Sequence, residues 1–177
     1  MQEKKRRRGI TLVETCMVLA VLGVLASTAV PGLQRLLEGR RLQGAAVQLA
    51  ADIQFVRTEA IARNRAIRLS VQRAGAQSCY VAHTGGAGEC RCLDAEPATC
   101  TDGAVPIKAV HFGAGSGTAV RSNVGSIVFD PLHGTSTPTG TLRLVAASGR
   151  EVHHVVNLMG RVRSCSPGAA VAGYVRC

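Results

Sequence analysis

Six of the seven cysteines in this 177-residue sequence lie beyond its apolar N-terminal run. They are Cys79, Cys90, Cys92, Cys100, Cys165 and Cys177. Thiolates can hold zinc, and Cys90 and Cys92 with His83 nearby allow such a site to be drawn. However, the two-residue separation is short for zinc, and an even number of cysteines in an oxidising compartment favours disulfides. We therefore predict up to three disulfides, no metal and no cofactor.

The pairing of these cysteines is only partly constrained. Two bridges among Cys79, Cys90, Cys92 and Cys100 would staple a turn-rich segment that has few apolar residues, but the sequence does not determine which cysteine pairs with which. A bridge from Cys165 to Cys177 would close the C-terminal tail into a compact loop. Such a loop loses less entropy when it binds a ligand, which favours a binding role for the tail.

The tail carries Arg161, Arg163 and Arg176, and no acidic residue follows Glu151. Residues two apart in an extended segment point the same way and lie about 7 Å apart, so Arg161 and Arg163 can reach successive phosphates of a nucleic-acid strand. Gly160 permits a close backbone approach or an unusual φ just before them. The alternative is an ordinary solvated strand face. The net charge of +10 falls to +6 without residues 1–9, which still permits a polyanionic partner.

No catalytic arrangement is evident around the five histidines, which are His83, His111, His133, His153 and His154. None stands beside a Ser, Cys or carboxylate in a recognised nucleophile motif. His153 and His154 would point to opposite faces of a strand. The glycine-rich stretch at 113–117 lacks the Lys and Ser/Thr of a phosphate loop and is typical of a flexible turn. We predict that the protein is not an enzyme.

Glu14 is the only charged residue between Ile10 and Val30, in an apolar run that would span roughly 31 Å as a helix. This run can cross a bilayer. The basic cluster before it should stay in the cytoplasm, which sends the C-terminal part outward, in agreement with the cysteines. An acid in a spanning helix costs about 2.5–3.5 kcal/mol on insertion scales and is a functional candidate, unless it snorkels to the interface.

The stretch RGITLVE at 8–14 resembles the type III signal of type IV pilins and pseudopilins. The resemblance implies that prepilin peptidase cleaves between Gly9 and Ile10 and that the new Ile10 amine is methylated. It also implies that Glu14, the fifth residue after the cut, pairs with that amine of a neighbouring subunit. A buried carboxylate is tolerated when an ammonium neutralises it, so assembly would depend on cleavage. Ile10 departs from the phenylalanine most common at this position.

Beyond the anchor, apolar residues recur in steps of four and three at Leu42, Ala46, Leu49, Ile53, Val56 and Ala60. This spacing predicts an amphipathic helix with Asp52 and Arg57 off the apolar stripe. Gly32, Gly39 and Gly44, after a pilin-like Pro31, indicate a bendable junction. From Ile67 the period changes to two, and further strands are expected near 79–83, 107–112, 125–130, 141–147 and 150–158.

These elements predict an α+β fold in which one long N-terminal helix packs on an antiparallel sheet. We expect a leader at 1–9, a transmembrane and filament-core helix at 10–31, its amphipathic continuation at 32–65 and a disulfide-stapled, β-rich globular part at 66–177. From about Leu42 onward the sequence resembles the FimT/GspH group of minor pilins and pseudopilins, which implies a pilin-like fold.

The tail sequence GRVRSCSP at 160–167 resembles the GRxR motif of FimT minor pilins associated with DNA uptake, whose arginines contact DNA. The resemblance implies DNA contacts by Arg161 and Arg163, with Gly160 as a positional aid, and we add Arg176. The expected function is that of a minor type IV pilin that binds DNA non-specifically for natural transformation. The alternatives are a structural minor pilin or type II secretion pseudopilin that primes or caps a filament, and a metal or redox module built on the cysteines.

The expected location follows from the same resemblance and from the charge pattern. The protein would be a single-pass protein of the bacterial inner membrane with a periplasmic C-terminal domain, and would enter the pilus after assembly. Its expected partners are other pilins or pseudopilins, prepilin peptidase, DNA and, through the N-terminal helix, the membrane.

Overall fold

The structure is a computed structural model that describes residues 11–93 and 97–177. The predicted cleavage and methylation residues, Gly9 and Ile10, lie outside this part. The chain divides into two compact units, residues 1–37 and 38–177. The second unit contains both large sheets, all three disulfides and the whole hydrophobic core, so it has what an independently folding domain needs.

Helix α1 runs from Leu12 to Ala62 and continues through Pro31. Thr11 caps its first turn, because the Thr11 hydroxyl oxygen accepts a hydrogen bond from the Glu14 amide at 3.3 Å. The helix ends at Ala62, three residues before the predicted boundary at 65. Asn64, just beyond the helix end, adopts a left-handed φ of 47°. Glu14 itself is exposed.

The predicted apolar stripe of α1 is confirmed, since its six residues from Leu42 to Ala60 are all at most 1% exposed. The prediction for Asp52 is wrong, because its side chain is buried with 4% exposed. Asp52 accepts hydrogen bonds from the Tyr80 hydroxyl at 2.7 Å and the Lys108 ammonium at 2.6 Å. A carboxylate tolerates burial when such partners satisfy it.

The first sheet has the strand order β5-β2-β1-β7-β8 and is antiparallel throughout. Its strands are β1 (Ile67–Ala74), β2 (Gln77–His83), β5 (Pro106–Phe112), β7 (Ser126–Phe129) and β8 (Ser136–Thr137). A hairpin at 75–76 joins β1 to β2. The segment between β2 and β5 holds β3 (Cys90–Arg91) and β4 (Thr99–Cys100), which pair with each other.

The second sheet has the order β12-β11-β10-β9-β6. It consists of β6 (Thr118–Ser122), β9 (Gly140–Ala146), β10 (Glu151–Val156), β11 (Val162–Ser166) and β12 (Val175–Arg176). Its strand pairs are antiparallel except for β11 with β12, which are parallel. The short 3₁₀ helix η1 (Pro167–Ala169) lies between these two strands in the chain. Alternate residues of β6, β9 and β10 are buried, as expected for a sheet with one solvated face.

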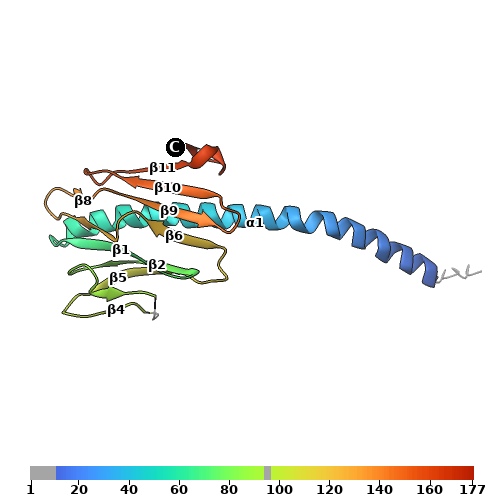
Figure 1. Cartoon of the computed structure of the whole chain (residues 1–177), viewed down its shortest axis with the longest axis horizontal. Helices are drawn as coiled ribbons and strands as arrows, with labels where there is room; N and C mark the ends of the chain where they lie inside the picture. Colours follow the sequence, from blue (N-terminus) through green and yellow to red (C-terminus); the bar gives the residue numbers. More distant parts are fainter. Residues whose placement is uncertain (1–10, 94–96) are drawn as a thin grey trace, which may run out of the picture. The chain divides into compact units, whose positions relative to one another are not determined.

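The second half of α1 shares one core with both sheets, and Figure 1 shows the strands running alongside it. Leu49 and Ile53 of the helix meet residues such as Phe129 of the first sheet and Leu144 of the second in that core. The outer face of the second sheet is left open to solvent by this arrangement. The α+β fold with an antiparallel β domain is confirmed.

Three disulfides staple the fold, as predicted. Cys79 of β2 pairs with Cys92, Cys90 pairs with Cys100, and Cys165 of β11 pairs with Cys177. The first two bridges belong to a small second cluster of buried residues that includes Val81 and Ala98. Cys16 is a free thiol of the first unit.

Candidate functional site

The tail arginines lie at the exposed end of the second sheet. Arg163 is in β11, opposite Val155 of β10, and Arg161 immediately precedes the strand. Arg161, Arg163 and Arg176 are all exposed, and none of them forms an ion pair with a carboxylate within residues 11–93 and 97–177. Three guanidinium groups are therefore available to an anion in solution.

A hollow of about 290 Å³ lies between two of these arginines. Val155, Val175 and the Cys165–Cys177 disulfide form its apolar lining, and Arg163 and Arg176 lie beside them. The hollow combines apolar surface with positive charge. This combination suits a ligand that is itself part apolar and part anionic, as nucleotides are.

The tail is held in place by more than its disulfide. Val171 is 2% exposed and belongs to the hydrophobic core, and the Gln43 side-chain amide of α1 donates a hydrogen bond to the Ala172 carbonyl at 2.8 Å. The Cys177 amide also donates to the Ser166 carbonyl at 3.3 Å. These contacts order the segment that carries Arg176 before any ligand arrives.

Gly160 occupies the turn that leads into the arginines, with a φ of 69°. It is buried, and a Cβ atom there would lie 2.5 Å from the Gly134 carbonyl oxygen and 2.9 Å from the Arg57 side chain. The turn is fixed further by the Arg161 amide, which donates to the Asn157 side chain at 2.9 Å. The close approach that the sequence predicted is thus to the protein itself, and Gly160 is buried away from any ligand in solution.

His153 and His154 point to opposite faces of β10, as predicted. His154 is fully buried, with its Nδ1 2.8 Å from the Ser164 hydroxyl and its Nε2 without a hydrogen-bond partner in the described part of the chain. Burial lowers its pKa from 6.5 to about 4, against a smaller opposing effect of the Ala46 backbone. On the outer face, the His153 Nε2 lies 2.8 Å from a Glu151 carboxylate oxygen.

Ser70 of β1 and His83 of β2 form a serine–histidine pair in the first sheet. Ser70 and His83 are 2.8 Å apart, but they are 5% and 0% exposed, and the second ring nitrogen of His83 lies 2.9 Å from the Thr84 carbonyl oxygen instead of a carboxylate. Burial lowers the pKa of His83. The pair is a satisfied part of the interior.

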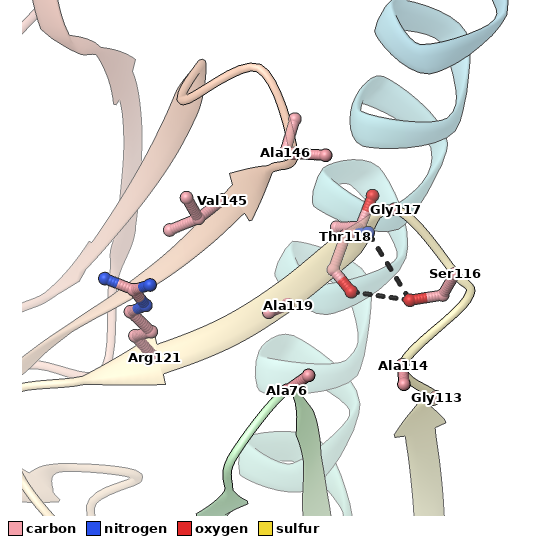
Figure 2. A pocket seen from close by; sticks show the side chains of 11 residues that line it. Ala76, Gly113, Ala114, Ser116, Gly117, Thr118, Ala119, Arg121, Val145 and Ala146 are labelled. Carbon is pink, nitrogen blue, oxygen red and sulfur yellow. Dashed lines mark hydrogen bonds between the residues drawn. The ribbon is translucent and has the colours of Figure 1, made fainter.

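The glycine-rich stretch at 113–117 forms a turn, and it borders a hollow of about 300 Å³ (Figure 2). The Ser116 hydroxyl closes the turn by donating to the Thr118 carbonyl at 2.7 Å. Arg121 is the charged residue of this lining, and Figure 2 shows its guanidinium group beside β6 on the side of Val145. The described lining offers no second cation for a phosphate.

The sequence analysis missed two exposed arginines on the outer face of the second sheet, Arg121 of β6 and Arg143 of β9. They are directly opposite each other in the antiparallel register. In the strand expected at 141–147, alternation is a signal that could have identified Arg143 as outward-facing. The position of Arg121 was not evident, because no strand was expected at 118–122.

Comparison with known proteins identifies the family. The model of the family described as Type II transport protein GspH matches residues 45–160, about two-thirds of the chain. The chain belongs to the GspH family. This GspH-family chain is also 32% identical over 166 residues to the pilin-like protein PilA1 of Thermus thermophilus, covering 89% of the chain and 97% of that relative.

The fold of this GspH-family protein is pilin-like. It is similar to the crystal structure of the type IV minor pilin FimU from Pseudomonas aeruginosa, with a TM-score of 0.51 and 18% sequence identity over 72% of the chain and 93% of that structure. The family match, the curated relative and this fold together show a pilin-like protein of the GspH family. The apolar start of α1 is long enough to cross a membrane, consistent with a single-pass anchor.

The GspH match ends at Gly160, directly before the tail arginines. The family assignment thus rests on the helix and the sheets and not on the tail. What the tail does must be argued from its own residues.

Proposed function

We propose that this protein is a minor type IV pilin that binds DNA without sequence preference through its C-terminal tail, for DNA uptake in natural transformation. Arg161, Arg163 and Arg176 are the proposed contact residues, and Gly160 is the residue that positions the first two. The observation that carries the proposal is the set of three exposed guanidinium groups without ion-pair partners in the described structure. Guanidinium groups bind phosphate oxygens well, often in a bidentate geometry.

The order of the tail supports a binding role. Arg163 belongs to a paired strand, and the segment leading to Arg176 is held by the disulfide, by Val171 in the core and by the Gln43 contact. A ligand that binds such a segment gives up little of its binding free energy to order it. No sequence readout is expected, because phosphate contacts position a protein on DNA without reading bases.

We further propose the maturation and location that the pilin resemblance implies. Prepilin peptidase would cleave before Ile10, and the methylated amine of Ile10 would pair with Glu14 of a neighbouring subunit. The anchor would lie in the bacterial inner membrane and the disulfide-bonded unit in the periplasm, where DNA and other pilins or pseudopilins can reach it. Oxidising conditions there agree with the three disulfides.

The second candidate is a structural pilin or type II secretion pseudopilin that primes or caps a filament without binding DNA. One observation favours it: apolar side chains remain exposed on the outward side of α1 within the globular unit, with Val47 64%, Phe55 41% and Ile61 47% exposed. Such a face suits contacts with neighbouring subunits. This function does not require the tail arginines.

The two candidates separate in a DNA-binding assay with the oxidised unit 38–177. Fluorescence anisotropy would follow its binding to a short labelled duplex across a salt series. The comparison is between the unsubstituted unit, Arg161→Gln/Arg163→Gln and the control Arg40→Gln/Arg41→Gln, which removes two exposed charges from α1. Thermal unfolding of each variant checks that it is folded.

The proposed function predicts that binding weakens steeply with salt. The tail variant should lower the slope of log K against log salt by about 1.8, because each phosphate contact contributes about 0.9. The helix control should keep the slope. If the unsubstituted unit binds no DNA at low salt, the structural role becomes the better description.

A further inference from the structure

The outer face of the second sheet carries a row of aligned side chains that runs across all five strands. In register, Arg121 of β6 is opposite Arg143 of β9, and Arg143 is opposite His153 of β10. His153 is in turn opposite Cys165 of β11, which pairs with Val175 of β12. The row therefore leads from Arg121 to the tail disulfide, and so to the hollow between Arg163 and Arg176.

Arg121 and Arg143 form a cross-strand pair of like charges. Both are exposed, and within the described residues neither forms an ion pair with a carboxylate. Directly opposite side chains in an antiparallel pair have Cβ atoms about 4.5–5.5 Å apart, and like charges at that separation destabilise a sheet. An anion bound between them would turn this repulsion into attraction for both guanidinium groups.

The two carboxylates near this face in the described structure contact other partners. The acidic side chain of β10 is Glu151, and its carboxylate is engaged by His153 at 2.8 Å. At the turn between β9 and β10, Glu38 contacts Arg150 at 3.3 Å and accepts a hydrogen bond from the Ser148 amide at 2.7 Å. These contacts lower the pKa of Glu38, the Ser148 hydrogen bond being the largest cause. Neither of these two carboxylates forms an ion pair with Arg121 or Arg143.

The spacing of the two arginine clusters suits one extended ligand. Three strand spacings separate β6 from β11, and at about 4.8 Å each this places Arg121 about 14 Å from the strand that carries Arg163. Phosphates of one DNA strand advance about 3.4 Å along the helix axis, so 14 Å corresponds to about four nucleotide steps. A small anion cannot touch both clusters, whereas a duplex can.

We propose that Arg121 and Arg143 are a second phosphate-binding cluster for the same DNA duplex that the tail binds, so that the duplex lies across the strands of the second sheet. This inference rests on the proposed function. It adds binding residues outside the tail and assigns the duplex an orientation, crossing β11, β10, β9 and β6 in turn. The Ser116–Thr118 turn and its hollow then lie at the far end of the footprint, beside Arg121 (Figure 2).

The test extends the anisotropy salt series on the oxidised unit 38–177 to Arg121→Gln/Arg143→Gln. Both side chains project to solvent, so the variant should remain folded, which its thermal unfolding checks. The control is again Arg40→Gln/Arg41→Gln, with the same change in net charge on a helix that faces the other side of the sheet. A hairpin whose stem has four base pairs is compared with a duplex of twenty, since four base pairs cover only about 10 Å and only the longer duplex can reach both clusters.

The proposal predicts that Arg121→Gln/Arg143→Gln lowers the salt slope on the longer duplex by about 1.8 while the tail still binds. If the variant and the unsubstituted unit bind equally at 1 M salt, this difference in slope makes the variant bind roughly 60-fold more weakly at 0.1 M salt. The loss should be smaller on the hairpin.

Two results would overturn the inference. If the sheet variant and the helix control have equal slopes while the tail variant loses binding, the proposed function stands and the footprint is limited to the tail. If the unsubstituted unit binds neither the hairpin nor the duplex, the proposed function has failed, and the second cluster fails with it.

Discussion

The buried His154 should make the stability of the folded protein strongly pH-dependent. The unfolded chain binds a proton at this histidine with its ordinary pKa of 6.5, whereas burial lowers the folded pKa to about 4. Between these two values the unfolded state holds more protons, so stability is present above pH 6.5 and is lost as the pH falls toward 4. The loss levels off once the pH is well below 4, where both states are protonated.

The size of the effect follows from the pKa difference. Since one pKa unit corresponds to about 1.36 kcal/mol, His154 should remove about 2 kcal/mol of the free energy of unfolding by pH 5 and about 3 kcal/mol by pH 4. The main cause is burial, which disfavours the charged imidazolium and outweighs the opposing effect of the Ala46 backbone on this pKa.

Urea unfolding of the oxidised unit 38–177 at several pH values from 7 to 4 would measure this loss. The variant His154→Leu should be free of the contribution, and His153→Gln, which changes the half-buried neighbour on the outer face, should retain it. His83 has a pKa that burial also lowers, but it is present in every variant and cancels in the difference. If His154→Leu loses as much stability on acidification as the unsubstituted unit, the reasoning is refuted.

Three further predictions concern stability. In urea unfolding, Gly160→Ala should lower the free energy of unfolding by roughly 2–4 kcal/mol, because the new side chain meets both a left-handed φ and close packing. The control Gly149→Ala, where φ is 82° and the space is open, should lower it by only about 1–2 kcal/mol. Equal losses would contradict the close packing at Gly160. Asp52→Ala should cost about 1–3 kcal/mol in the same assay by leaving two donors unpaired, and an unchanged midpoint would show that water replaces the carboxylate. Arg121→Glu should raise the free energy of unfolding by about 0.2–1 kcal/mol by pairing with Arg143, while weakening DNA binding; a lower thermal midpoint would contradict the like-charge repulsion.

Local sequence patterns predicted the parts of the fold that depend on local periodicity. The four-and-three spacing from Leu42 to Ala60 identified the buried stripe of α1, and alternation located β1, β2, β5, β7, β9 and β10. Asp52 was misjudged because its partners, Tyr80 and Lys108, come from strands distant in the sequence. Polarity alone could not reveal that two strands would bring donors to a helix.

The candidate site was predictable only in part for the same reason. The sequence singled out Arg161 and Arg163 because they are neighbours along the chain. Arg121 and Arg143 are neighbours only through strand pairing, and β6 is a short strand that was not expected. Register is set by packing across the whole sheet, so a basic row across strands has no signature in a linear pattern.

The two disulfides between β2 and β4 are interleaved, since Cys90 lies within the Cys79–Cys92 loop and Cys92 lies within the Cys90–Cys100 loop. A single peptide-bond cut anywhere between Cys79 and Cys100 is therefore spanned by at least one bridge. The two chain pieces remain one covalent molecule after such a cut. In a compartment rich in proteases, a nicked subunit could thus stay attached to its anchor and keep its second sheet. A sequential pairing of the same four cysteines would leave the 90–91 and 91–92 bonds unprotected.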